Sequence, residues 1–256
     1  MYPVLLKIGF VTIYTYGFFV AVAFFMALRF TKKEAIRLSE DPEKIMDLSF
    51  YILIAGVLGA RIVYVFTVPD TFLSNPIEIF KIWNGGLVFY GGFIGAFATL
   101  IFFVKKNRVS LLKYLDIYAP AIALGHFFGR LGCFSAGCCY GRQCDFFWSV
   151  IFSNPDSLAP RGIALHPTQL YSALANILLF IFLYFFRYRK KFNGQVFFLY
   201  VFLYGIIRSV IETFRGDYRG YIIFKSLSLS QTIGIGFSIC ALIMLVILSR
   251  DKKTDI

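Results

Sequence analysis

The sequence predicts an all-α polytopic membrane protein with about seven transmembrane helices and a small extracytoplasmic cap. Of its 256 residues, 59% are hydrophobic and only 16% are charged, which leaves too little polar surface to enclose a soluble globule. Apolar stretches of about 20 residues recur along the chain, and that length matches the thickness of a bilayer core. Most Lys and Arg residues lie in short segments between these stretches, as expected for a membrane protein of fixed orientation.

Seven apolar stretches are candidate membrane spans. They cover roughly residues 10–30, 47–66, 86–104, 114–134, 168–186, 195–214 and 229–249. The first follows MYPVLLKIG without a small-residue cleavage site, and further spans come after it, so we do not expect it to be a removable signal peptide. The chain has no Pro/Ser-rich linker, low-complexity segment or evident internal repeat. These features predict a single integral membrane domain over residues 1–256.

Two connecting segments are too long to be simple turns. Residues 67–85 include PIEIFKIW, which predicts an amphipathic segment lying in the membrane interface with its Ile, Phe and Trp side chains towards lipid. Residues 135–167 follow a cysteine-rich stretch and predict the small cap.

The basic residues predict the orientation of the spans. One side carries Arg29, Lys32, Lys33, Arg37, Lys44, Lys105, Lys106, Arg108, Lys113, Arg187, Arg189, Lys190, Lys191, Arg250, Lys252 and Lys253. By the positive-inside rule this side is cytoplasmic, which with seven spans places the N-terminus outside and the C-terminus in the cytoplasm. The net charge of +12 then reflects topology and contact with anionic lipids. Nucleic acid is not an expected partner, because the basic residues are divided among short loops.

Ionisable residues inside the predicted spans are the strongest functional signal. Each costs about 2.5–3.5 kcal/mol at a helix centre. They are Arg61, Arg130, Arg208 and Glu212, and Arg215 follows Glu212 on the same predicted helix face. Any one of them is compatible with an interhelical contact or with snorkelling to the headgroups. Arginines on three separate helices nevertheless indicate a lipid phosphate or an anionic substrate, because guanidinium binds phosphate through two parallel hydrogen bonds.

Glycine spacing predicts close packing between helices. Residues 85–96 read GGLVFYGGFIGA and residues 125–132 read GHFFGRLG, and both contain small residues four apart. The glycine pairs on either side of Tyr90 also leave room for a lipid headgroup beside the backbone.

Four of the five cysteines lie close together, in and just after GRLGCFSAGCCYGR. They are Cys133, Cys138, Cys139 and Cys144, with the spacing C-x4-C-C-x4-C. Zinc sites and thiol oxidoreductases usually contain a CxxC pair, which this chain lacks. Structural disulfides or buried thiols are therefore the favoured interpretation. Cys240, in the last span, is expected to be a small core residue.

The chain resembles the bacterial prolipoprotein diacylglyceryl transferase family. The resemblance rests on GRLGCFSAGCCYGR together with other pieces in the same order, over about residues 16–215. These pieces are TYG at 15–17, GARI at 59–62, GGLVFYGGFIG at 85–95, HPTQLY at 166–171 and RSVIETFR at 208–215. Each piece alone is short, but the combination is specific.

The resemblance implies a seven-helix enzyme of the bacterial inner membrane that needs no cofactor and no metal. Members of the family transfer the diacylglyceryl group of phosphatidylglycerol to the lipobox cysteine thiol of a preprolipoprotein and release glycerol 1-phosphate. The implied partners are phosphatidylglycerol, preprolipoprotein signal peptides and membrane lipids. Cations that hold the departing phosphate suit this reaction.

The resemblance also assigns roles to particular residues. Arg130 and Arg208 fall where the family has arginines needed for activity, and Glu212 matches their acidic partner. Tyr16 matches an important tyrosine and Gly141 a required glycine. We group Tyr16, Arg61, Gly141, Glu212 and Arg215 as expected substrate-binding residues, and Arg130, Arg208, His166 and Tyr90 as expected catalytic residues.

Three positions depart from the best-known members of the family. Tyr90 stands where they have His, Cys133 where they have Asn, and Cys138 where they have Glu. The Tyr90 departure matters most, because the missing His has been proposed as the base that deprotonates the incoming thiol. A tyrosine hydroxyl is a poor base at neutral pH.

His166 is the candidate replacement for that base. It begins HPTQLY at the outer end of the fifth span, where a substrate cysteine would arrive, and imidazole accepts protons near neutral pH. A purely positioning role ahead of Pro167 remains the alternative. His126, in the middle of a span, is expected to serve packing or hydrogen bonding.

Two other functions remain compatible with these residues. A lipid- or anion-binding membrane transporter would use the same arginines, but internal repeats or broken helices would then be expected. A membrane thiol redox protein would need an exposed cysteine pair with a lowered pKa.

Overall fold

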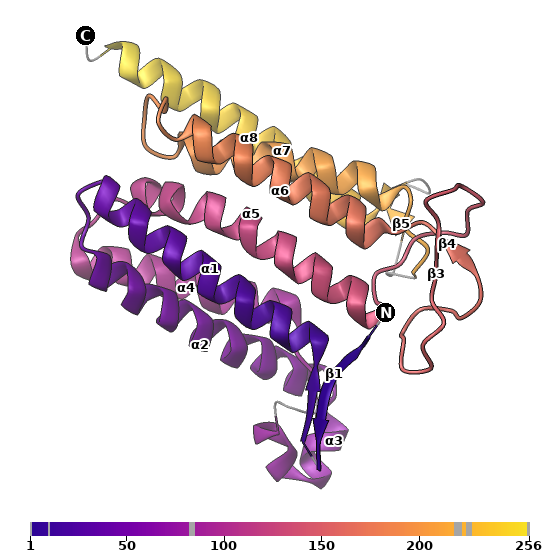
Figure 1. The fold of residues 1–256 in the computed structure, drawn as a ribbon. Coiled ribbons are helices and arrows are strands. Elements are labelled where there is room, and N and C mark those ends of the chain that lie inside the picture. Colours follow the sequence, from indigo (N-terminus) through magenta and orange to yellow (C-terminus); the bar gives the residue numbers. More distant parts are fainter. Residues whose placement is uncertain (1, 10, 82–84, 218–221, 224–226, 255–256) are drawn as a thin grey trace. The chain divides into compact units, whose positions relative to one another are not determined.

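The computed structural model describes residues 2–9, 11–81, 85–217, 222–223 and 227–254 of the chain. Helices dominate it (Figure 1). The helices are α1 (Thr15–Arg37), α2 (Pro42–Thr67), α3 (Pro69–Ser74), η1 (Pro76–Phe80), α4 (Phe89–Asn107), α5 (Leu111–Ala136), α6 (Thr168–Phe186), α7 (Gln195–Glu212) and α8 (Leu229–Thr254). The predicted all-α, multi-pass architecture is confirmed.

Seven of these helices coincide with the seven predicted spans, and six of the seven are long and apolar enough to cross a membrane. The seventh is α5, which carries Lys113, Asp116, His126 and Arg130 and has Pro120 within it. Helix α5 is polar at these positions because several of its side chains make the polar contacts described below.

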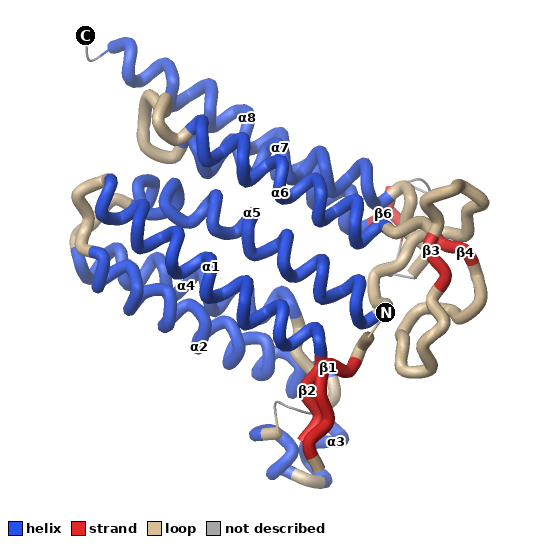
Figure 2. The backbone as a smooth tube through the Cα atoms, in the orientation of Figure 1, coloured by secondary structure: helices blue, strands red, loops and turns tan. Residues whose placement is uncertain are grey.

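The first span begins later than the sequence predicts. Residues before Thr15 form an antiparallel hairpin of β1 (Val4–Ile8) and β2 (Val11–Tyr14), shown in red in Figure 2. Gly9 has φ 58°, a left-handed conformation that favours glycine and suits the turn. The Thr15 amide donates to the Pro3 carbonyl at 2.9 Å, so the hairpin ends where the helix begins. The predicted start at residue 10 is therefore wrong, because the alternating run VTIY pairs as a strand.

The chain divides into two compact units, residues 31–114 and residues 1–30 with 115–256. The single-domain interpretation stays a prediction. In the first unit, α2 and α4 pack through their glycines. A Cβ at Gly91 would lie 2.3 Å from the Gly59 carbonyl oxygen, and one at Gly95 would lie 2.4 Å from that of Ala55. The pair after Tyr90, Gly91 and Gly92, thus serves close backbone packing rather than leaving space for a headgroup. In the pair before it, Gly86 lies against the Tyr64 ring, and a Cβ at Gly85 would meet no described atom within 4 Å.

The other unit is built around α5, α6 and α7. Its core contains Ala119 and Ala123 of α5, Leu179 and Leu183 of α6, and Val196 and Tyr200 of α7. Helix α8 packs on α7 at another close approach, where a Cβ at Gly205 would lie 2.5 Å from the Gly234 carbonyl oxygen. In the GHFFGRLG motif, Gly132 packs against Tyr16 and Phe19. A Cβ at Gly125 or Gly129 would meet no atom of the described chain within 4 Å, so these two glycines do not pack as predicted.

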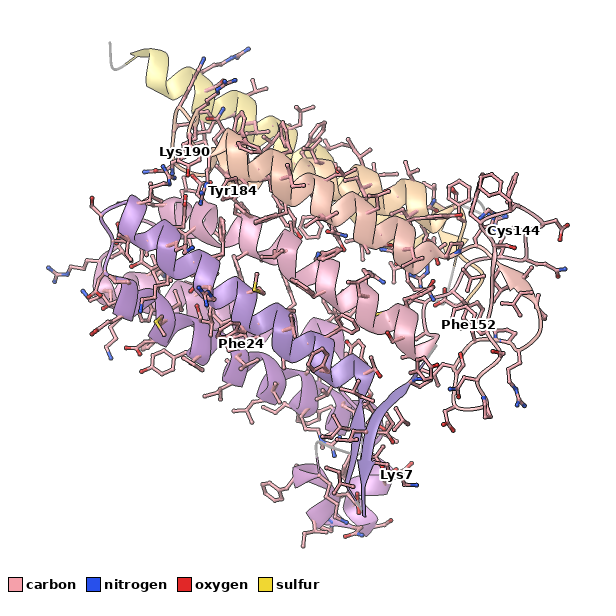
Figure 3. The ribbon with its side chains drawn as sticks, viewed as in Figure 1. Lys7, Phe24, Cys144, Phe152, Tyr184 and Lys190 are labelled. Carbon is pink, nitrogen blue, oxygen red and sulfur yellow. The ribbon has the colours of Figure 1, made fainter. Side chains whose placement is uncertain are left out.

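Small strands build the cap beyond the N-terminal end of α6. They are β3 (Val150–Ile151) with β4 (Ala164–Leu165), and β5 (Ile222–Ile223) with β6 (Leu227–Ser228). Phe152, Ala159 and Leu165 form the small apolar core of the cap. Cys144 and Phe152 in the cap lie at the opposite end of α6 from Lys190 (Figure 3). This separation agrees with placing the cap and the basic 187–191 turn on opposite membrane faces.

The predicted interfacial segment falls partly on α3 and η1. Ile77 and Phe80 are largely exposed, as a lipid-facing surface requires, whereas Trp83 lies outside the described residues. The interfacial placement stays a prediction.

Candidate functional site

Three segments that are distant in sequence meet beside the cap. They are the signature segment around Gly141, the start of α6 around His166, and the chain just after α7. The Gly141 amide donates to the His166 carbonyl at 3.0 Å, and the His166 amide donates to the Arg142 carbonyl at 2.9 Å. The Arg142 amide donates to the Phe214 carbonyl at 2.9 Å, and Gly216 donates to Tyr140 at 3.2 Å. These backbone bonds fix the segments against one another.

Gly141 is the point of closest approach. A Cβ on this residue would lie 2.5 Å from His166 Cβ, 2.6 Å from the His166 carbonyl oxygen and 2.8 Å from that of Phe214. Two of these three atoms belong to backbone, which cannot rotate away as a side chain can. The requirement for glycine that the resemblance implies thus has a steric cause.

Several charged residues lie at the C-terminal end of α7 and just after it. Arg208 forms an ion pair with Glu212 one helical turn later, and Arg215 Nε lies 3.8 Å from the same carboxylate. The Ser228 hydroxyl donates to Glu212 Oε1 at 3.1 Å. Arg215 also donates from Nε and from a terminal nitrogen to the two carboxylate oxygens of Asp217, at 2.8 and 2.7 Å. The predicted single helix face is correct for Arg208 and Glu212 only, because α7 ends at Glu212 and Arg215 lies in the following turn.

Arg130 differs from these arginines in having no counter-ion among the residues that the structure describes. It is half-buried on α5, and within the described part of the chain no hydrogen bond or ion pair joins its guanidinium to another residue. Its nearest electrostatic neighbours include Tyr204, Cys133, Cys139 and Arg215. The guanidinium therefore keeps its donors available for an anion from outside the protein.

Tyr16 lies near Arg130 and the cysteines. It lies in the first turn of α1 and packs over Gly132, where a Cβ would lie 3.1 Å from its ring. It is 45% exposed and within electrostatic range of Arg130 and of the cysteines.

His166 stands directly before α6, as predicted, and is held through its side chain. Its Nδ1 lies 3.0 Å from the Tyr171 hydroxyl, which accepts a hydrogen bond from Trp148 Nε1 at 2.7 Å. The rings of Phe146 and Phe214 flank the imidazole at centroid distances of 5.7 and 5.4 Å. If Nδ1 carries the hydrogen and donates it to Tyr171, then Nε2 is left unprotonated and can accept a proton.

His126 serves the interior of the helix bundle, as predicted. Its Nδ1 lies 3.2 Å from the hydroxyl of the buried Tyr200, and its ring stacks near Tyr204.

All five cysteines are free thiols in the described structure, so of the two favoured interpretations it shows thiols rather than disulfides. The sulfurs of Cys133, Cys138 and Cys139 lie within 4.8 Å of one another, whereas Cys144 lies apart and is buried. Hydrogen bonds from the Cys133 and Cys138 thiols lower the pKa of the Cys139 thiol, and Arg215 lowers it further. Cys240 is exposed on the outer face of α8, so the prediction of a core position is wrong. An apolar helix in a membrane presents small residues to lipid as readily as to its core.

The other two predicted site residues belong to the other unit. Arg61 is buried, and backbone carbonyls surround its guanidinium. Nε donates to Ile79 at 3.0 Å, and the two terminal nitrogens donate to Glu78, Lys81, Gly85 and Gly86. Its donors thus hold the segment after η1 in place. Tyr90 is 54% exposed at the start of α4, beside Phe89.

Sequence reasoning missed several residues of this site. Asp217 gives Arg215 its bidentate partner, and Thr168 and Gln169 bind the backbone of the cysteine segment. The signal for Asp217 was its place two residues after an arginine of the RSVIETFR motif. Nothing in the sequence separates Thr168 and Gln169 from ordinary helix N-terminal residues.

Comparison with known proteins gives one consistent result. A family model described as prolipoprotein diacylglyceryl transferase matches residues 3–247. The phosphatidylglycerol–prolipoprotein diacylglyceryl transferase of Clostridium tetani is 36% identical over 253 residues, which cover 99% of this chain and all of the relative. The enzyme of the same name from Finegoldia magna is 36% identical over 242 residues, covering 91% of each chain. A second such enzyme of Clostridium perfringens is 34% identical and covers 87% of this chain and 86% of the relative.

Proposed function

The chain belongs to the prolipoprotein diacylglyceryl transferase family, and we propose that Arg130 binds the phosphate of its lipid substrate during the transfer. The protein is a multi-pass membrane enzyme that transfers a diacylglyceryl group, and the names of its relatives identify phosphatidylglycerol and prolipoprotein as the substrates. The partners in finer detail are the lipobox cysteine of a preprolipoprotein signal peptide and the surrounding membrane lipids.

The reaction requires groups that stabilise the negative charge of the departing phosphate. The thiol sulfur of the lipobox cysteine forms a bond to the terminal carbon of the diacylglyceryl group, and the bond from that carbon to the phosphate oxygen breaks. The phosphate leaves as glycerol 1-phosphate with one additional negative charge. Hydrogen-bond donors fixed around that phosphate stabilise the transition state more than the ground state.

The absence of a counter-ion on Arg130 is the observation that carries this proposal. Arg208 and Arg215 are held by Glu212 and Asp217, and these pairs fix their guanidinium groups at the end of α7. A half-buried arginine with no such partner among the described residues favours binding an anion that arrives with the substrate. Arg208 and Arg215 then add guanidinium donors beside Arg130, with Glu212 holding them in position, and Tyr16 orients the same phosphate.

His166 is the base that accepts the thiol proton in this proposal. Imidazole is suited to this role near neutral pH, and the hydrogen bond between His166 and Tyr171 supports an orientation in which Nε2 faces the reacting thiol. Tyr90 contributes a positioning hydroxyl rather than a base. Arg61 acts indirectly by holding residues 78–81 and 85–86, which precede α4 and Tyr90.

The proposed location is the bacterial cytoplasmic membrane, with the N-terminus outside and the C-terminus in the cytoplasm. The separation of the cap from the basic 187–191 turn supports this orientation, because basic turns favour the cytoplasmic face (Figure 3). The substrate cysteine would then arrive on the side of the cap.

The test follows labelled diacylglyceryl from phosphatidylglycerol into a lipobox peptide, with purified protein in detergent. Arg130→Ala is expected to lower the transfer rate by about 100-fold or more, the usual effect of removing one donor to a developing anion. Arg130→Lys should restore little, because an ammonium lacks the planar fork. Arg161→Ala, at an exposed arginine of the cap, is the matched control and should keep wild-type rates. Wild-type turnover in Arg130→Ala would refute the phosphate assignment.

A further inference from the structure

Three thiols that are separated in sequence converge at the end of α5. Cys133 lies in the last turn of the helix, and Cys138 and Cys139 follow two and three residues after its end. The chain reverses through left-handed conformations at Gly137 (φ 77°) and Cys139 (φ 63°). This reversal returns both later cysteines to the first, and the three sulfurs lie within 4.8 Å of one another.

The backbone of this cluster is held from outside. The Thr168 hydroxyl donates to the Cys139 carbonyl at 2.7 Å, and Gln169 Nε2 donates to the Cys138 carbonyl at 2.8 Å. Both donors lie in the first turn of α6 and are almost fully buried. A site whose ligating residues are already fixed loses little conformational entropy when an ion binds.

We propose that Cys133, Cys138 and Cys139 form a three-thiolate site for a thiophilic d10 cation, Zn²⁺ or Cu⁺. Thiolate is the ligand that these ions prefer. A Zn–S bond length of about 2.3 Å places tetrahedrally arranged sulfurs about 3.8 Å apart, so no pair of these sulfurs needs to approach by more than about 1 Å. A disulfide needs a sulfur separation of about 2.05 Å, a considerably larger movement. Water or an anion fills the position that the three sulfurs leave open.

The surrounding charge suits such a complex. Three thiolates around Zn²⁺ carry one net negative charge, and around Cu⁺ they carry two. Arg215 approaches the cluster through Cys139. Cys144 belongs to the same segment but lies outside the cluster, and Cys240 is exposed on α8. A bound ion would cross-link the end of α5 to the segment that carries Gly141, so its role is structural.

The test uses reduced, metal-free protein in detergent, with Cd²⁺ as the spectroscopic probe for thiolate coordination. Titration should give a sulfur-to-cadmium charge-transfer band that saturates at one ion per chain. Zn²⁺ and Cu⁺ are then added separately as competitors, and whichever displaces Cd²⁺ at the lower concentration is the preferred ion. Each of Cys133→Ser, Cys138→Ser and Cys139→Ser should weaken Cd²⁺ binding by more than the 10- to 100-fold caused by losing an outer-shell contact. Cys144→Ser and Cys240→Ser are the matched controls and should bind as the wild type does.

Three results would overturn the proposal. They are no saturating band in the wild-type protein, equal loss of binding in the control variants, or a disulfide among these cysteines that forms in air even with Zn²⁺ present. If a serine variant fails to fold, the wild-type protein alone still tests the proposal. Its thermal unfolding midpoint should rise with added Zn²⁺ or Cu⁺ and fall back when a chelator removes the ion.

Discussion

At the scale of single residues, the arginines have different surroundings despite their similar sequence context. Arg61 lies within a set of backbone carbonyls, Arg208 and Arg215 are paired with carboxylates, and Arg130 has no such partner among the described residues. A guanidinium already occupied by five carbonyls cannot also hold a substrate phosphate. The partner of each side chain, rather than its presence in a span, therefore separates a structural arginine from a substrate-binding one.

Replacing Arg208 should lower activity, whereas replacing Arg61 should lower stability. Arg208→Ala removes a cation held at the end of α7 and is expected to lower transfer by about 100-fold with little effect on membrane insertion. Arg61→Ala should instead lower the free energy of unfolding, by about 3 kcal/mol or more, because it leaves several buried carbonyls without donors. Turnover and detergent-denaturant unfolding of both variants give the comparison. Equal turnover losses with unchanged stability would contradict it.

The base has a smaller expected effect than the phosphate ligands. A free thiol is already a few per cent thiolate at pH 7, so His166→Gln should slow transfer by only about 10- to 100-fold, with the largest deficit at low pH. Tyr90→Phe should cost a similar factor by removing a positioning hydroxyl. Rates measured between about pH 6 and 9 test both variants, with Tyr171→Phe as a probe of how the imidazole is oriented. Full activity of His166→Gln over that range would leave His166 a positioning residue only.

At the scale of elements, helix ends are joined by groups from elsewhere in the chain. Asp116 of α5 accepts hydrogen bonds from the Gly194 and Phe197 amides, each at 2.9 Å, and from Lys190 at 3.0 Å. It therefore supplies, from a neighbouring helix, the N-terminal cap that α7 lacks in its own sequence. Near the N-terminal end of α6, backbone bonds join residues 140–142 to His166 and to Phe214 and Gly216, which follow α7.

Removing the Asp116 carboxylate should loosen the α5–α7 junction. Asp116→Ala leaves two helix N-terminal amides and a lysine without their acceptor, and we expect it to cost about 2–4 kcal/mol of unfolding free energy. Denaturant unfolding in mixed micelles measures this cost. Asp47→Ala, at an exposed aspartate of α2, is the control and should change stability by less than about 0.5 kcal/mol. A cost no larger than that of the control would exclude a capping role for Asp116.

Adding a methyl group at Gly141 should affect both stability and activity. Gly141→Ala places a methyl group 2.6 and 2.8 Å from two backbone carbonyl oxygens, so the α6 and α7 segments must separate. The expected cost is about 1–3 kcal/mol of stability together with most of the transferase activity. Gly236→Ala, where an added Cβ meets nothing within 4 Å, is the control. A fully active and stable Gly141→Ala protein would show that the segments can move apart harmlessly.

At the scale of the whole molecule, the distribution of basic loops makes a prediction about orientation. Ser110→Cys, in a basic loop, should be labelled by an impermeant maleimide only after the membrane is opened. Ser153→Cys in the cap should react in intact cells, and both side chains are exposed. Labelling is compared with the parent protein to subtract its own cysteines. The reverse pattern would invert the proposed topology.

The sequence by itself determined the membrane class and the seven helical stretches, because composition and hydrophobic runs are local properties of the chain. It also carried the family resemblance, which depends on short motifs in a fixed order. It could not determine that VTIY pairs as a strand or that α7 stops before Arg215. Nor could it show that backbone carbonyls surround Arg61, whereas Arg130 has no counter-ion in the described part of the chain. Nor could the spacing C-x4-C-C-x4-C indicate that three sulfurs meet. These outcomes depend on contacts between residues distant in the chain, which only the tertiary structure brings together.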